Sequence, residues 1–100
     1  MNPDIIYLDP SVREASMHLI DYSALAGDVE VTTSPDGIEK VEPRWAGLST
    51  GQTILWEALA SLNSQVPVIL GRLDRVDLPS RTALHTALGL ALGVVSGVAA

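Results

Sequence analysis

The last nineteen residues of the chain, Thr82 to Ala100, contain no charged side chain. Within this segment Gly89, Gly93 and Gly97 are spaced four apart, which places them on one face of a helix. Missing side chains on a helix face let another backbone approach closely, as in a glycine zipper. The segment therefore predicts a closing helix with a tight packing contact, and it predicts no chemical reaction.

At about 100° per residue, the closing helix divides into two faces. One is a core stripe formed by Leu84, Leu88, Ala91, Leu92, Val95 and Ala99. The opposite face is made only of small residues, namely Thr82, Thr86, Gly89, Gly93, Ser96, Gly97 and Ala100. A solvent-facing helix would carry Lys, Glu or Arg there. Interior glycines cost about 0.8 to 1.0 kcal/mol each relative to alanine, so either packing offsets this cost or the helix ends early.

Three arrangements of this face remain open. The glycines pack under the hairpin or the first helix of the same chain, or the end of the chain frays beyond Gly93. Alternatively, the face pairs closely with another chain, either a second copy or a host protein. The third arrangement is a tail anchor in a membrane. The seven Leu and Val residues contribute only about −2 to −4 kcal/mol to insertion, opposed by His85, the hydroxyl residues and the glycines, so membrane insertion is disfavoured.

Length and composition indicate one small globular domain, residues 1–100. The chain is 47% apolar and 18% charged, which is typical of a folded rather than a disordered sequence. No cysteine is present, which excludes disulfides and thiolate zinc sites and suits the cytoplasm. The first residues lack the basic and apolar regions of a signal peptide. We therefore expect a cytoplasmic protein.

The net charge of −6 is distributed unevenly. Residues 1–57 carry ten acidic and three basic side chains, whereas residues 58–100 carry two acidic and three basic ones. Nucleic-acid binding needs a basic face, and only the cluster Arg72, Arg75 and Arg81 could supply it. Because Asp74 and Asp77 alternate with these arginines, binding of nucleic acid is the weaker alternative.

Local patterns predict five elements. Asp9 and Pro10 begin a helix over 10–25. Alternating residues around the turn at 34–37 predict a β-hairpin over 29–42. Ser49 and Gln52 form a capping box that begins a helix over 50–62, with Asn63 as its stop. The segment 66–73 fits a strand or a short helix over 67–73, and the helix is preferred. The closing helix spans about 79–97, which gives an α+β fold of one hairpin and three or four helices.

Part of this pattern resembles small uncharacterised proteins of actinobacteria and their phages. There a hairpin leads to a Trp, a Leu-Ser-x-Gly-Glu helix start, a Leu-Asp pair and a closing helix. The matching residues here are Trp45, Leu48, Ser49, Gly51, Gln52, Leu73 and Asp74. The chain departs from the pattern in having Gln52 in place of Glu, a change that the capping box tolerates, and in lacking a charged outer face on the closing helix. The resemblance implies a fold and a phage or prophage origin, and no activity.

Candidate chemical sites are sparse. Glu14, His18 and Asp21 would share one face of the first helix, but one helix supplies at most three ligands and this pattern is typical of a solvated face. No nucleophile elbow, phosphate-binding loop or Cys dyad occurs. We therefore expect a protein that is not an enzyme, with no cofactor, no metal site and no catalytic residue.

The sequence thus predicts a non-enzymatic interaction protein, a homodimer or the partner of a host protein. Its contact residues would be Gly89, Gly93, Ser96 and Gly97, with Trp45 and Trp56 as flanking anchors.

Overall fold

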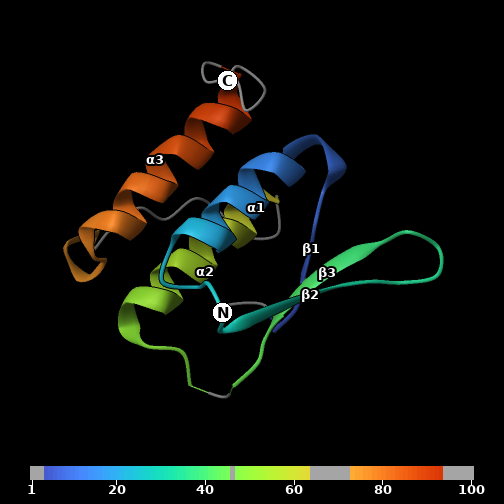
Figure 1. The fold of residues 1–100 in the computed structure, drawn as a ribbon, viewed down its shortest axis with the longest axis horizontal. Coiled ribbons are helices and arrows are strands. Elements are labelled where there is room, and N and C mark those ends of the chain that lie inside the picture. Colours follow the sequence, from blue (N-terminus) through green and yellow to red (C-terminus); the bar gives the residue numbers. More distant parts are fainter. Residues whose placement is uncertain (1–3, 46, 64–72, 94–100) are drawn as a thin grey trace.

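The computed structural model describes residues 4–45, 47–63 and 73–93, which form an α+β fold. A three-stranded antiparallel sheet has the order β1–β3–β2, and three α-helices lie together beside it (Figure 1). The strands are β1 (Ile6–Tyr7), β2 (Val29–Thr33) and β3 (Glu39–Pro43). The helices are α1 (Arg13–Tyr22), α2 (Thr50–Leu62) and α3 (Leu78–Leu92), with short 3₁₀ helices η1 (Pro10–Val12) and η2 (Leu73–Arg75).

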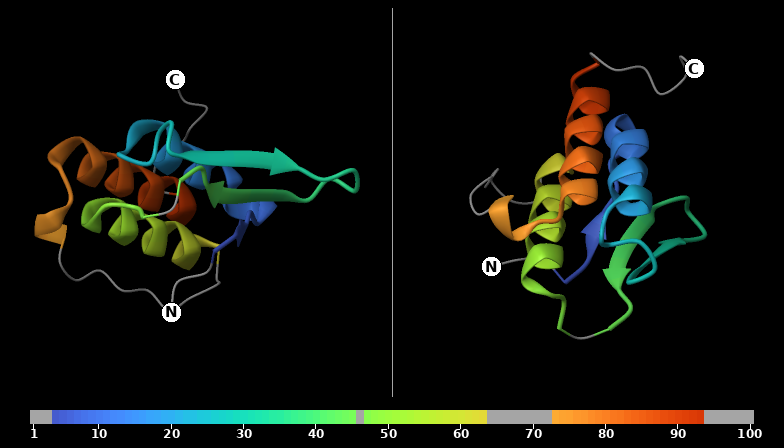
Figure 2. Two further views of the ribbon diagram at one scale, coloured as in Figure 1. Left: turned by 90° about the horizontal axis from the view of Figure 1, so that it is seen from below. Right: turned by 60° about the vertical axis from the view of Figure 1, so that its left-hand side comes forward.

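The predicted hairpin is present, and a third strand joins it. β2 pairs with β3 in a register that places Val31 opposite Val41, and the turn end of the hairpin extends away from the helices (Figure 2). β1 pairs with the other edge of β3, with Ile6 opposite Val41. Ile6 and Tyr7, which precede the first helix, are therefore part of the sheet, so the expectation of one hairpin alone is corrected to three strands.

The core lies between the inner face of the sheet and the helices. Its most buried large side chains come from every layer, namely Ile6, Leu19, Leu25, Val41, Leu55 and Leu59. α1 runs beside α3, and their backbones approach each other along most of their length (Figures 1 and 2). The buried residues of α3 include Ser80, Ala83 and Ala87, whose small side chains permit this approach. Close small-residue packing of α3 thus occurs within the chain.

This packing uses a different face of α3 from the predicted one. Of the predicted small-residue face, Gly89 is buried and Thr86 is half-buried, but Thr82 and Gly93 are exposed. Of the predicted core stripe, Leu84 is buried and Leu88 is partly buried, whereas Ala91 and Leu92 are exposed. The predicted division of the helix into two faces is wrong because Ser80, Ala83 and Ala87 are small enough to pack in the core against α1, which the pattern of large apolar residues does not reveal.

The predicted ends of two helices are also corrected. α3 ends at Leu92, because Gly93 adopts the left-handed conformation (φ 78°) and caps the helix. The expected boundary at 97 is therefore wrong, and Ser96 and Gly97 lie outside the described residues. The first helix begins with one 3₁₀ turn and ends at Tyr22 rather than at 25. The predicted boundaries of α2 are confirmed, whereas the predicted short helix over 67–73 falls almost wholly outside the described residues.

Candidate functional site

A groove of about 380 Å³ lies where the end of α1 meets the N-terminal ends of α2 and α3. Its polar wall is formed by Ser49, Gln52, Asp77 and Ser80. Both helices begin here because each has a side-chain cap: the Ser49 hydroxyl accepts from the Gln52 N–H (3.1 Å), and the Asp77 carboxylate accepts from the Ser80 N–H (3.0 Å). The predicted capping box is confirmed, since the Ser49 N–H also donates to Gln52 Oε1 (2.9 Å).

Gln52 does more than complete this capping box. Its Nε2 donates to the carbonyl oxygen of Ala24 (2.9 Å) and to Asp28 Oδ2 (2.6 Å), so it ties α2 to the segment between α1 and β2. The other carboxylate oxygen of Asp28 accepts from Trp45 Nε1 at 3.2 Å. The amide at position 52 therefore serves as donor and acceptor at once, which a glutamate cannot do when ionised.

We expect Gln52→Glu to lower the free energy of unfolding by about 1 to 3 kcal/mol at pH 7, although either residue can complete a capping box. The new carboxylate would face Asp28 and the Ala24 carbonyl oxygen, where Gln52 now donates two hydrogen bonds. Urea denaturation measures this loss. Asp28→Asn in the same chain should restore most of it by supplying a donor, and equal stability of Gln52→Glu and wild type would contradict the prediction.

Ser80 connects the groove to the core. Its hydroxyl accepts from the Ala24 N–H (2.8 Å), and its side chain is almost fully buried. Hydrogen bonds from the hydroxyl and then the backbone N–H of Ser80 lower the pKa of Asp77, with a further contribution from the positive charge of Arg81. The polar groups in this part of the groove therefore already bond one another, and the arrangement stabilises the meeting of three segments.

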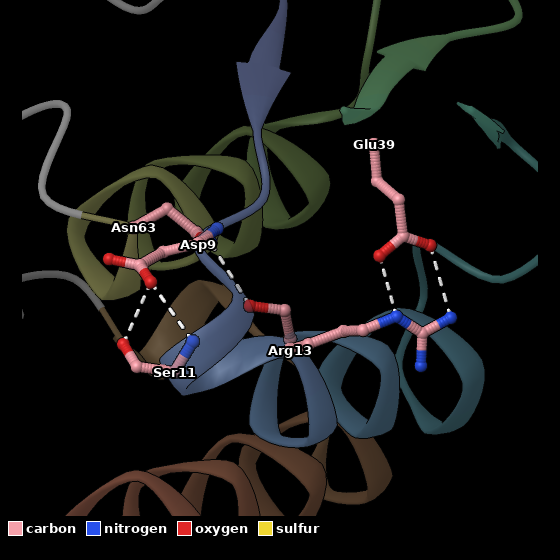
Figure 3. Close-up of polar contacts among 6 residues, drawn as sticks. Asp9, Ser11, Arg13, Glu39 and Asn63 are labelled. Carbon is pink, nitrogen blue, oxygen red and sulfur yellow. Dashed lines mark hydrogen bonds and ion pairs between the residues drawn. The ribbon is translucent and has the colours of Figure 1, made fainter. Parts of the chain in front are cut away.

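A second polar cluster lies at the opposite end of α2, where Asn63 is the C-cap (Figure 3). Asn63 Oδ1 accepts from the Asp9 N–H (2.7 Å), while Nδ2 donates to Ser16 Oγ (3.0 Å) and to the Leu59 carbonyl oxygen (2.9 Å). The backbone N–H and then the hydroxyl of Ser11 lower the pKa of the Asp9 carboxyl. Asn63 was predicted only as a helix stop, and its role in joining α2 to α1 is new.

The hairpin is tied to α1 by one bidentate ion pair (Figure 3). Arg13 Nε lies 2.6 Å from Glu39 Oε1, and its Nη2 lies 3.1 Å from Oε2. The hydrogen bonds from Arg13 lower the pKa of Glu39, and Glu39 raises the pKa of Arg13. Because both groups are solvent-accessible, this contact orients the hairpin more than it stabilises the fold.

The two tryptophans have opposite environments. Trp45 is 65% exposed. Its Nε1 donates to Asp28, which also accepts from the groove residue Gln52. Trp56 is 3% exposed and belongs to the core, so the expectation that it anchors a partner is wrong in this fold. α2 buries residues on more than one face, and Trp56 and Ala60 lie beside the face formed by Ile54, Leu55, Ala58 and Leu59.

The basic cluster is only partly described. Arg75 is exposed and pairs with Asp74 (3.8 Å), and Arg81 is exposed next to the capping residue Asp77. Arg72 lies outside the described residues. Both described arginines of this cluster, Arg75 and Arg81, thus have a carboxylate beside them, as expected from the alternation of charges in the sequence.

The aligned polar residues of α1 form no metal site. Glu14 and Asp21 are exposed, and the His18 ring stacks on Tyr22 with centroids 4.6 Å apart. Across the residues that the structure describes, no group of three or more His, Asp or Glu side chains could hold a metal ion.

Two residues were not predicted from the sequence: Ser80, which lines the groove, and Asp28, which accepts a hydrogen bond from the groove residue Gln52. Asp28 precedes β2 in what reads as an ordinary acidic loop, and Ser80 reads as a helix-start residue although Asp77 is the cap. The Asp-x-x-Ser spacing from Asp77 to Ser80 is itself a helix-start signal. The hydrogen-bond partners of Asp28 and Ser80, however, lie more than twenty positions away in the sequence, so no local pattern reveals them.

Comparison with protein-family models, curated proteins and solved structures finds no significant match to this chain. None of the helices in the described part of the chain has the length and apolar character needed to cross a membrane.

Proposed function

We propose that this chain is a non-enzymatic interaction protein that self-associates through the outer face of α3. This surface, called the α3 outer face, consists of Leu78, Arg81, Thr82, His85 and Leu92, all of which are exposed. The observation that carries the proposal is the exposure of two leucines, Leu78 at 66% and Leu92 at 76%, at opposite ends of one helix. In an antiparallel pair of α3 helices related by a twofold axis, Leu78 of one copy would lie near Leu92 of the other, so that both lose their exposure.

Charge supports a second copy as the occupant. The chain carries a net charge of −6, so most of its surface repels another copy. α3 itself, from Leu78 to Leu92, has no acidic side chain and Arg81 as its one charged residue. A twofold contact between two α3 helices would therefore bring the leucines together where electrostatic repulsion is weakest. Exposed Gly93 at the end of α3 would extend this contact without a side chain in the way.

Leu92→Glu tests the proposal. Light scattering of the wild type should give about twice the chain mass of 10.6 kDa at high concentration. The substitution should weaken association at least about tenfold, because a twofold contact buries the new charge twice. Ile38→Glu is the matched control, since Ile38 is also exposed but lies at the hairpin turn. A wild type that stays monomeric at all concentrations, or equal effects of the two substitutions, would overturn self-association.

Two other functions remain as weaker proposals. A host protein would occupy the same α3 outer face, in keeping with the resemblance to phage-type proteins, and capture of that protein should be lost in Leu92→Glu.

A DNA-associated regulator would use Arg75 and Arg81, and salt-dependent binding to duplex DNA tests it. The carboxylates beside both arginines favour the protein partner.

A further inference from the structure

β2 is an edge strand of the sheet (Figure 2). Its five residues, Val29 to Thr33, include no lysine or proline, the residues that commonly protect an edge from pairing with another chain. The opposite edge is β1, which is only two residues long. Of the two edges, β2 is therefore the one long enough for pairing, although the carbonyl oxygen of its first residue, Val29, already accepts from Arg44 Nε (3.2 Å).

The register shows which backbone groups of β2 are free. The Arg44 N–H donates to the Asp28 carbonyl oxygen (2.9 Å), and the Ser34 N–H donates to the Ile38 carbonyl oxygen (2.8 Å). Because hydrogen-bonded and non-bonded positions alternate in an antiparallel pair, the even-numbered residues of β2 bond to β3 and the odd-numbered ones point outward. Within the described residues, no hydrogen bond uses the outward N–H and C=O groups of Val31 and Thr33.

The outer face of the sheet carries an unfavourable charge arrangement next to this edge. Glu30 of β2 lies directly opposite Glu42 of β3. Like charges in this position are destabilising. Lys40 lies 3.7 Å from Glu42 and offsets its charge, whereas Glu30 has no ion pair among the residues described. Glu30 is exposed at the edge, where a basic side chain on an added strand would lie beside it.

Two further side chains of β2 would contact such a strand. Val31 packs against the core but remains partly exposed, so an apolar neighbour would complete its burial. Thr32 Oγ1 is buried and has no hydrogen-bond partner in the described part of the chain. Rotation of the Thr32 side chain would turn this hydroxyl toward a Ser or Thr on an added strand, as in the threonine pairs of other sheets.

We infer that the free edge of β2 binds an extended basic segment of another protein as a fourth, antiparallel strand. The segment carries Lys or Arg opposite Glu30, an apolar residue opposite Val31 and Ser or Thr opposite Thr32. Backbone hydrogen bonds to Val31 supply affinity, and the alternating side chains supply specificity. This surface is separate from the α3 outer face, so the inference does not depend on self-association.

The probe is a capped, fluorescein-labelled peptide with the sequence Ser-Val-Thr-Val-Lys-Val-Ser, whose binding is measured by fluorescence polarisation. N-methylation of its central valine removes the N–H that would donate to the Val31 carbonyl oxygen, and it should weaken binding at least about tenfold. N-methylation of the adjacent lysine, whose N–H would point away from β2, is the matched control and should change binding less than about twofold. Both peptides are measured on the unaltered protein, so folding of a variant does not enter the comparison.

Charge reversal tests the contact with Glu30. Glu30→Lys should weaken binding of the lysine peptide about tenfold, and a peptide with Glu in place of Lys should bind Glu30→Lys better than it binds the wild type. Asp21→Lys makes the same change in net charge on α1 and should have a smaller effect. Leu92→Glu should bind the peptide as the wild type does, which separates this surface from the α3 outer face. Equal binding of the two N-methylated peptides, or no preference for lysine over glutamate, would overturn the inference.

Discussion

Replacing Asn63 with alanine should lower the free energy of unfolding by about 3 kcal/mol, a large part of the stability expected of a 100-residue domain. The side chain is 7% exposed and makes three hydrogen bonds, to Asp9, Ser16 and Leu59. Its removal leaves the Ser16 hydroxyl, which is fully buried, without this donor. Such a group costs about 1 to 3 kcal/mol when it loses its partner.

A double-mutant cycle with Ser16→Ala separates this network from simple loss of volume. If Asn63 and Ser16 stabilise each other, the double variant should be less destabilised than the sum of the single variants by about 1 kcal/mol in urea denaturation. Asn63→Asp is an informative second variant, because it keeps the acceptor for the Asp9 N–H and loses the donor to Ser16. Additive losses in the cycle would show that the two side chains act independently.

Gly51→Ala should destabilise the protein by about 2 kcal/mol, although alanine is the better helix former by about 1 kcal/mol. A Cβ atom at position 51 would lie 2.8 Å from the backbone oxygen of Arg75. The backbone of η2 cannot move aside as a flexible side chain would. To make room for the new Cβ atom, α2 and η2 would therefore have to separate. The groove between α2 and α3 should widen as a result.

The control for this prediction is Thr50→Ala, one residue earlier on an exposed position of α2. It should change the unfolding free energy by no more than about 0.5 kcal/mol. Thermal and urea denaturation of both variants give the comparison. A Gly51→Ala variant more stable than the wild type would contradict the close approach of α2 to Arg75.

Local signals predicted well wherever a residue acts on its immediate neighbours. The capping box at Ser49 and Gln52 and the boundaries of α2 depend on hydrogen bonds within one helical turn, and both are confirmed. The cap at Asp9 and the turn before Ile38 are equally local. The run from Ile5 to Leu8 has strand-like residues, but it was left out of the predicted sheet because so short a run does not reveal its partner β3.

Contacts between distant segments could not be predicted in the same way. Gln52 meets Asp28, and Asn63 meets Ser16, across 24 and 47 residues. Gln and Glu at position 52 were expected to be interchangeable, because both complete the capping box with Ser49 and the sequence does not show the contacts with Ala24 and Asp28. The free edge of β2 likewise became apparent only when the strand order placed β3 in the middle of the sheet.

The sequence by itself determined the α+β class, the hairpin and the boundaries of α2. These features arise from capping, turn chemistry and apolar periodicity, which act over a few residues. Only the tertiary structure decided which face of α3 packs closely and against which backbone, because the side chains of Ser80, Ala83 and Ala87 are also small enough for close packing. The neighbour is α1 of the same chain, and Gly93 ends the helix instead of extending its small-residue face.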